Sequence, residues 1–372
     1  MEQKFEQMPT CFALSPLVGG GGEDEEGGGG GGNQGDGVIR MAVGFVDGSV
    51  ELGTVEAIAG GNKCKYESGW SREQKRAIRS LLFAADGATL WTVSANRGLC
   101  SYDVETGKRT RVIRESHDDK PLSMYRLPPL STRGQQFVTG DESGQIRSWD
   151  WRVKEPIVCT YDEQEESINA FAMDQHTLLA ASSDGTLGAY EMRKRKLLMC
   201  SELMHSELLS IAVSDKFTYV GSGDGHVEVF NKGEYGNLLE RIESGHGKSV
   251  SACVQLRRGL LLTGSDEESE LRLLHTEPNR RLGVAATHGD GGVDQLATTA
   301  DDQWIVSLAS FDQSIRYFPM QAVLEKVPLV RADSIAKKKK SEAENTVTEN
   351  FFDDLIEQTK KDESEDDDEE EE

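Results

Sequence analysis

Two glycine-rich stretches contain residue types that bind phosphate in other proteins. Residues 245–249 read Gly-His-Gly-Lys-Ser, and the order Gly-Lys-Ser ends the P-loop, in which backbone amides and a lysine hold phosphate oxygens. A P-loop also needs a glycine five residues before Gly247, and this chain has Ile242 there. Residues 221–225 lie between two predicted strands, so they open no helix that would hold a dinucleotide. We therefore expect both stretches to be loops.

Three histidines stand at comparable places along the chain. His117, His246 and His288 each come just before a predicted strand, and imidazole is a common general base and metal ligand. The cysteines lie far apart without a Cys-x-x-Cys pair, and no nucleophile-elbow or zinc-protease motif is present. We interpret the histidines as structural hydrogen-bonding groups. The sequence therefore predicts no enzyme, with no catalytic, cofactor-binding or metal-binding residues and no small-molecule substrate.

The elements that position these residues repeat along the chain. A tight turn of the Asp-Gly type, with an alternating strand before it and another after it, recurs at Gly48, Gly98, Gly144, Gly185, Gly225, Ser269 and Gln313. The intervals are 50, 46, 41, 40, 44 and 44 residues, close to the roughly 40–45 residues of one four-stranded propeller blade. A β-sandwich of irregular hairpins would not keep one period along the whole chain. The predicted fold class is all-β, a seven-bladed β-propeller formed by residues 1–320.

Two segments differ in composition from the repeats. Residues 19–37 are rich in glycine and acids, and we expect a flexible insertion in the first blade, between strands predicted at 8–14 and 38–43. Residues 321–372 are expected to form a disordered tail with an acidic end. Its lysine cluster is predicted to be a nuclear import signal, or else a solvated charge run, and its adjacent phenylalanines are predicted to dock into a partner. These tail residues are Lys337, Lys338, Lys339, Lys340, Phe351 and Phe352.

The charge is strongly negative and unevenly distributed. The chain has 41 basic and 65 acidic side chains, a net charge of −24, and residues 341–372 alone carry −14. This balance excludes a protein that coats nucleic acid or anionic membranes uniformly. No apolar stretch is long enough to cross a bilayer, and the N-terminus lacks the apolar segment of a signal peptide, so we expect no membrane partner and a cytosolic or nuclear location.

The predicted loops emerge from two opposite sides of the propeller. Basic residues are found mainly in the loops of one side and acidic residues in the loops of the other. Turns before the outer strands carry the basic residues Lys108, Arg109, Arg111, Arg152, Lys154, Arg193, Lys194, Arg195, Lys196, Lys232, Arg280 and Arg281. Turns and connections on the other side carry the acids Asp47, Asp118, Asp119, Asp141, Glu142, Asp162, Glu163, Glu165, Glu166, Asp184, Asp224, Asp266, Glu267, Glu268, Glu270 and Asp312. We predict one basic and one acidic rim, the alternative being that charges simply populate loops.

The pair Trp149-Asp150 at a strand end and the pair Gly245-His246 before a blade resemble the WD-repeat family. In that family a histidine, a serine or threonine, an aspartate and a tryptophan form a hydrogen-bonded set within a blade. His117, Thr139 and Trp149 fit this set in the best repeat, and Ser143 stands where we expect the aspartate. The resemblance implies a WD-repeat propeller.

A closer resemblance, over roughly residues 38–357, is to the WD repeat-containing protein 55 family. It is carried by the run from Gly140 to Arg152, the basic residues 193–196, the run Glu-Pro-Asn-Arg-Arg at 277–281, the Asp312-Gln313 turn, the lysine cluster and the Phe-Phe segment. The resemblance implies a nuclear and nucleolar scaffold, with some presence in the cytoplasm, that acts in ribosomal RNA processing and large ribosomal subunit biogenesis. On this hypothesis the partners are pre-ribosomal: the basic rim meets ribosomal RNA or an acidic partner, and the acidic rim and tail engage basic ribosomal proteins or assembly factors. We expect a monomer within a larger assembly.

An alternative function follows from one tetrapeptide. Trp149-Asp150-Trp151-Arg152 matches the Trp-Asp-x-Arg signature of WD-repeat proteins that act as substrate receptors of a cullin–RING ubiquitin ligase through its DNA-damage-binding adaptor. Arg152 would offer a planar fork to adaptor carboxylates. Together, the two hypotheses predict partner-binding roles for Trp149, Asp150, Arg152, Arg193, Lys194, Arg195, Lys196, Arg280, Arg281, Phe351 and Phe352.

Overall fold

The computed structural model describes residues 2–16, 39–58, 63–74, 76–128 and 135–327. These belong to one compact unit, Met1–Val327. The predicted insertion at 19–37, the lysines at 337–340 and the phenylalanines at 351 and 352 lie outside the described residues.

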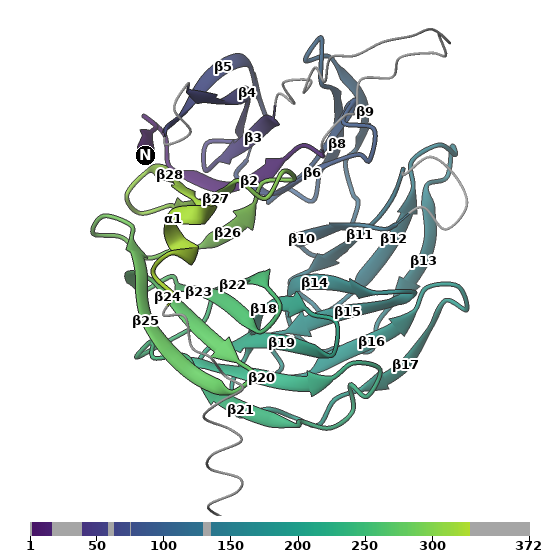
Figure 1. The fold of residues 1–372 in the computed structure, drawn as a ribbon. Helices are drawn as coiled ribbons and strands as arrows, with labels where there is room; N and C mark the ends of the chain where they lie inside the picture. The colour runs from purple at the N-terminus through teal and green to yellow at the C-terminus, as the bar shows by residue number, and fades with distance from the viewer. Residues whose placement is uncertain (1, 17–38, 59–62, 75, 129–134, 328–372) are drawn as a thin grey trace, which may run out of the picture. The chain divides into compact units, whose positions relative to one another are not determined.

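Seven antiparallel sheets of four strands each form a ring (Figure 1). Each sheet is one blade, and we label its strands a to d from the centre outwards; the predicted propeller is confirmed. Blade 1 consists of β2 Pro9–Leu14, β3 Ile39–Phe45, β4 Ser49–Ile58 and β5 Lys63–Glu73, and blade 2 of β6 Ile78–Phe83, β7 Thr89–Ser94, β8 Leu99–Asp103 and β9 Arg109–Ile113. Blade 3 consists of β10 Pro121–Arg126, β11 Gln136–Asp141, β12 Ile146–Asp150 and β13 Ile157–Tyr161, and blade 4 of β14 Ile168–Asp174, β15 Thr177–Ser182, β16 Leu187–Glu191 and β17 Lys196–Cys200. Blade 5 consists of β18 Leu208–Val213, β19 Phe217–Ser222, β20 His226–Asn231 and β21 Glu240–Glu243, and blade 6 of β22 Ala252–Arg257, β23 Leu260–Ser265, β24 Glu268–Thr276 and β25 Asn279–Thr287. Blade 7 consists of β26 Gln295–Thr298, β27 Trp304–Ala309 and β28 Ser314–Pro319, with β1 Glu2–Lys4 as its outer strand.

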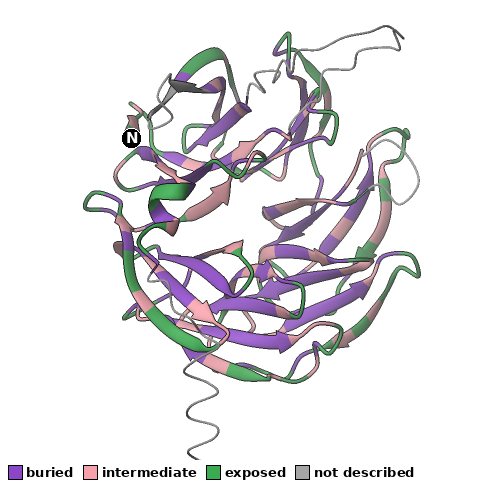
Figure 2. Ribbon diagram, viewed as in Figure 1, coloured by how far each residue is buried: buried purple, intermediate pink, exposed green. Residues whose placement is uncertain are grey.

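The b strands are more deeply buried than the outer strands. The b strands β7, β11, β15, β19, β23 and β27 are buried along nearly their whole length, because both faces of a blade pack against neighbouring blades. The outer strand β17 alternates exposed and half-buried residues, as expected for a strand with one face towards water. Figure 2 shows exposed segments concentrated at the periphery of the ring. The core therefore consists of sheet-to-sheet interfaces.

The turns explain why glycine marks the repeats. Gly144 has φ +89°, and a Cβ there would lie 2.2 Å from the carbonyl oxygen of Gln164, so any larger residue would collide with the backbone of the next connection. In blade 2 the positive φ belongs to Arg97 (65°) and not to Gly98. Left-handed positions in the described turns are therefore occupied by glycine at Gly144 and by a polar residue at Arg97.

Side chains of the inner strands join each blade to the next around the axis. At most junctions a side chain in strand a, or just before it, hydrogen-bonds to a carbonyl in or just before the neighbouring strand a. At the junction of blades 2 and 3, Arg79 forms an ion pair with Glu142 (3.7 Å). The hydrogen-bonded pairs are Thr10 Oγ1 to Ile78 O (2.6 Å), Ser123 Oγ to Ile168 O (2.7 Å), Asn169 Nδ2 to Leu208 O (2.8 Å), Ser210 Oγ to Val250 O (2.9 Å) and Ser251 Oγ to Val293 O (2.9 Å). The ring surrounds a polar cavity of about 530 Å³ lined by strand-a residues of all seven blades.

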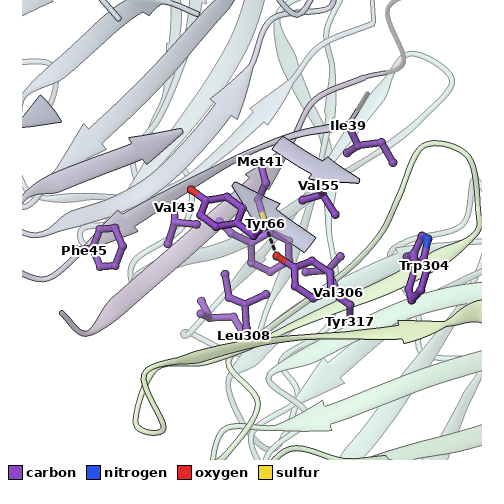
Figure 3. Packing of buried hydrophobic residues seen from close by; sticks show 12 residues of the cluster. Ile39, Met41, Val43, Phe45, Val55, Tyr66, Trp304, Val306, Leu308 and Tyr317 are labelled. Carbon is purple, nitrogen blue, oxygen red and sulfur yellow. Dashed lines mark hydrogen bonds between the residues drawn. The ribbon is translucent and has the colours of Figure 1, made fainter. Parts of the chain in front are cut away.

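The ring closes where the two ends of the propeller meet. Strand β1 is the outer strand of blade 7 and pairs with β28, with Gln3 opposite Ile315. At the centre, Gln295 Oε1 accepts the N–H of Phe12 (2.9 Å) and Gln295 Nε2 donates to its carbonyl (3.0 Å). Between these contacts lies an apolar cluster from blades 1 and 7, in which the Tyr317 hydroxyl approaches the Met41 sulfur (3.6 Å; Figure 3).

The folded chain extends further than we expected from the repeats. The short helix α1, Met320–Leu324, follows β28, and the side chains of Met320, Val323 and Val327 are buried in the cluster of blades 6 and 7. The boundary at residue 320 is therefore corrected to Val327. The reason is the burial of apolar residues just beyond the last strand.

Loss of the closing contact should weaken the whole ring. In Gln295→Ala, the N–H and C=O of buried Phe12 lose their partners, and we expect the free energy of unfolding in urea to fall by about 1–3 kcal/mol. The control Gln303→Ala removes an exposed amide of the β26–β27 turn and should change stability by less than about 0.5 kcal/mol. Equal stability of the two variants would contradict the proposed importance of the closing contact.

Candidate functional site

A buried hydrogen-bonded set lies at the centre of blade 3. His117 Nδ1 lies 3.1 Å from Asp141 Oδ2, His117 Nε2 lies 2.5 Å from Thr139 Oγ1, and Trp149 Nε1 donates to that same hydroxyl oxygen (2.7 Å). The arrangement fits a neutral imidazole that donates from Nδ1 and accepts the threonine proton at Nε2. The set is complete, because Asp141 and not Ser143 is its acid; Ser143 instead donates its N–H and hydroxyl to Asp141 Oδ1 (3.0 and 2.8 Å).

Burial determines the protonation of this set. Desolvation lowers the pKa of His117 below its ordinary 6.5, and the neighbouring Asp141 carboxylate offsets this only in part. Burial alone would raise the pKa of Asp141, but the hydrogen bonds from His117 and Ser143 outweigh burial and lower it. The pair is therefore neutral histidine with ionised aspartate, and neither reaches solvent, so the set is structural.

Other blades fill the same place with different groups. His246 lies 3.2 Å from Thr263 Oγ1 and 2.9 Å from Glu268 Oε2, so glutamate replaces aspartate in blade 6. In blade 2, Gln74 Nε2 donates to Thr92 Oγ1 (2.7 Å).

Blade 4 uses a related pair, since the Tyr190 hydroxyl donates to Gln164 Oε1 (3.2 Å). Sequence reasoning missed Gln74 and Gln164, although each precedes an inner strand as the histidines do.

No group of three or more metal-ligating side chains occurs within the described residues. The stretch that resembles a P-loop is a connection between blades, in which Lys248 forms an ion pair with Glu267. Within the same part of the chain, no helix is long and apolar enough to cross a membrane. The remaining candidate sites are the loop surfaces of the propeller.

Antiparallel strands place the b–c turns and the d–a connections on one side, which we call the bc face. A group of its acids, the acidic patch, lies in blades 3 to 5: Asp162, Glu163, Glu165, Glu166, Asp184, Glu202 and Glu207. Hydrogen bonds hold the patch together, from Glu165 N–H to Asp184 Oδ2 (3.0 Å) and from the Ser183 hydroxyl to Glu207 Oε2 (3.5 Å). None of these carboxylates forms an ion pair with another described residue.

Not every predicted acid contributes to this face. Asp141 is buried in the hydrogen-bonded set of blade 3. Several others are neutralised by cations nearby, as in the ion pairs of Asp118 with Arg147 (2.9 Å) and of Glu142 with Lys120 (2.8 Å). Asp47, Asp119 and Asp266, in other blades, also lack an ion-pair partner among the described residues, and the acidic patch is the group of such acids shared by neighbouring blades.

The opposite side, the cd face, carries both signs of charge. Its c–d turns hold the predicted basic residues, but the a–b turns emerge on the same side and add Asp86, Asp215, Asp301 and Asp302, together with Arg257 and Arg258. The a–b turns were absent from the sequence-based sorting of loops. Basic charge is therefore concentrated in the outer turns of blades 2 to 4 and does not cover the whole face.

Comparison with known proteins identifies the family. No family model matches the chain. It is 30% identical over 284 residues to WD repeat-containing protein 55 of Rattus norvegicus, covering 75% of this chain and 71% of the relative, and equally similar to that of Mus musculus, with 70% of the relative covered. The chain belongs to the WD repeat-containing protein 55 family. The relative from Arabidopsis thaliana is 26% identical over 298 residues, 77% of this chain and 78% of that protein.

A solved structure supports the fold of this family member. A chain in the crystal structure of the mitotic checkpoint complex superimposes with a TM-score of 0.62 at 15% identity, covering 75% of this chain and 83% of that one. Similarity at this level of identity concerns the fold alone.

The tetrapeptide at the end of β12 is largely engaged within the chain. Trp149 is buried. Asp150 binds the guanidinium of Arg152 through Nε (2.8 Å) and Nη2 (2.5 Å). This contact holds the pKa of Asp150 far below its ordinary value. In this WD repeat-containing protein 55 relative, the fork of Arg152 is therefore occupied by a carboxylate of its own turn.

The other predicted basic residues are exposed on two separate hairpins. Arg193, Lys194 and Arg195 lie in the turn between β16 and β17, and Lys196 is the first residue of β17. On β25, Arg280 is exposed and Arg281 forms an ion pair with Glu243 (3.4 Å). The structure places the two groups in blades 4 and 6, so they form two sites and not one.

The blade 3 set predicts a pH dependence of stability. Because the folded pKa of His117 is lowered, the unfolded chain binds more protons near its ordinary 6.5, and stability is lost as pH falls below that value. His117→Gln retains a donor and an acceptor but does not titrate, so the decrease in unfolding free energy between about pH 7.5 and 5.5 should become smaller. A pH profile parallel to that of the unmodified protein would exclude His117 as a source of the dependence.

Proposed function

We propose that this protein is a non-enzymatic scaffold of the nucleus and nucleolus that acts in ribosomal RNA processing and large ribosomal subunit biogenesis. The biological setting comes from the resemblance to the WD repeat-containing protein 55 family. The physical observation that carries the proposal is the acidic patch, whose carboxylates have no ion-pair partner among the described residues. A rigid ring with such a surface is suited to binding and is not arranged for chemistry.

The acidic patch fits a basic protein. Like charges held close together repel each other, and a segment rich in lysine and arginine relieves that repulsion while its own charge is compensated. Ribosomal proteins and assembly factors with basic extensions have this chemistry. We infer that the bc face holds such a segment during assembly.

The geometry favours this scaffold over the ubiquitin-ligase receptor. The ligase hypothesis requires Arg152 to present its guanidinium to adaptor carboxylates, whereas Asp150 already binds Nε and Nη2. An adaptor would have to displace an intramolecular carboxylate, with the cost of breaking two charge-assisted hydrogen bonds. The carboxylates of the acidic patch accept hydrogen bonds from neutral groups, but none is paired with a cation among the described residues.

Depletion and replacement test the proposal. Loss of the protein from its native cells should cause precursor ribosomal RNA to accumulate, and re-expression should reverse the accumulation. Glu165→Gln/Glu166→Gln should restore processing to about half or less and should bind salt-extracted large-subunit proteins more weakly. Normal precursor levels after depletion would refute the proposed function.

A matched variant controls for the loss of charge. Asp215→Asn/Glu234→Gln removes the same charge from exposed positions on the cd face, and it should restore processing fully. If both variants restored processing equally, the acidic patch would not be the binding surface.

A further inference from the structure

We propose that the outer turns of blades 2 to 4 form a binding surface for the backbone of double-stranded RNA. This surface, the basic strip, consists of Lys108, Arg109, Lys154, Arg193, Lys194, Arg195 and Lys196. The inference rests on the proposed function, because it names the chemical form of RNA that the scaffold would hold.

The charges of the basic strip are exposed and come from consecutive blades. Each of its side chains is solvent-exposed, and none forms an ion pair with another described residue. Of two nearby acids, Asp150 is paired with Arg152, whereas Asp103 accepts the N–H and hydroxyl of Thr106 (2.8 and 2.6 Å) and keeps its charge. The exposed acids interspersed in the strip are Glu105 and Glu155. The local charge is therefore positive on a chain that is negative overall.

The turn of blade 3 is fixed by the preceding blade. Arg111 on β9 donates from Nη1 to the carbonyls of Trp151 (3.1 Å) and Val153 (2.9 Å), and from Nη2 to that of Lys154 (2.6 Å). Its guanidinium also lies 4.7 Å from the centre of the Trp151 ring, a cation–π distance. Lys154 is therefore carried on a turn whose carbonyls at residues 151, 153 and 154 are all bound by Arg111.

The turn of blade 2 is fixed in the same way by blade 1. Arg72 on β5 donates from Nε to the carbonyl of Gly107 (2.8 Å), and Trp70 Nε1 donates to that of Val104 (2.8 Å). Gly107 packs so closely that a Cβ would lie 2.8 Å from the Trp70 ring. Lys108 and Arg109 thus begin a strand whose turn is docked on its neighbour.

These contacts favour a duplex over a single strand. Proteins that bind single strands stack bases on exposed aromatic rings, whereas the rings of Trp70 and Trp151 are engaged by Arg72 and Arg111. The exposed large apolar residues described on these three blades are aliphatic: Val112, Val153, Ile157 and Leu198. The exposed cations come from three consecutive blades. A-form RNA, with its regularly spaced phosphates, is recognised by its shape and backbone, so a duplex fits a surface that offers cations and no exposed aromatic ring among its described residues.

Binding of the full chain to defined RNAs tests the inference. The probes are a mixed-sequence RNA duplex of about 20 base pairs, the corresponding single strand and a polyglutamate peptide. We expect the duplex to bind about tenfold more tightly than the single strand at equal salt, with affinity falling as salt rises. Tighter binding of the single strand or of polyglutamate would overturn the proposal in favour of a different ligand.

Two matched pairs of variants locate the surface. Arg193→Gln/Lys194→Gln should weaken duplex binding about tenfold and reduce the slope of log affinity against log salt by about 2, whereas Arg257→Gln/Arg258→Gln, with the same charge change in the β22–β23 turn, should not. Arg111→Gln should weaken binding more than Arg109→Gln, because only the former releases the Trp151–Lys154 turn. Equal effects within either pair would overturn the role assigned to the strip or to Arg111.

The RNA-binding tests can fail without refuting the proposed function. If depletion disturbs precursor processing but duplex binding is unaffected by the variants, the scaffold acts through its acidic patch, and the RNA inference alone fails.

Discussion

Ring closure is the constraint on which the rest of this structure depends. Each blade is a thin sheet that must bury both faces, and only a neighbouring blade on each side can cover them. The first and last blades therefore need each other. Strand β1 on the outside, Gln295 at the centre and the apolar cluster between them satisfy that need. Every loop surface discussed above keeps its place because the ring is closed.

The hydrogen-bonded sets inside the blades differ in their chemical groups from one blade to the next, whereas each blade has the same four-stranded sheet. His117 with Asp141, His246 with Glu268 and the glutamines of blades 2 and 4 perform the same task with different groups. Each set links a d–a connection to the blade that follows it. The chain can vary these groups because the apolar interfaces and the inner ring of hydrogen bonds already align the blades.

The turn spacing was sufficient to predict the seven blades, because a tight turn is a local property of a few residues. The prediction that placed Ser143 in the position of the aspartate was wrong for the opposite reason. The acid of the set, Asp141, lies two residues earlier, and its partner His117 is 24 residues away in the sequence. The local sequence of the turn therefore could not show which position binds the histidine. The contact of Arg111 with the turn at 151–154 spans 40 residues or more, and no periodicity in the sequence marks it. The mixed charge of the cd face was missed because the a–b turns do not share the repeat signature.

The place of β1 in blade 7 also has a consequence for synthesis. The register pairs Lys4 with Ser314, 310 residues later in the chain. At about 5–20 residues per second, roughly 15–60 s pass between the emergence of the two strands from the ribosome. During that time the N-terminal strand has no partner, and blade 1 has one uncovered face. The molecule proposed here to assist ribosome assembly thus has an incomplete ring of its own until β28 has been translated.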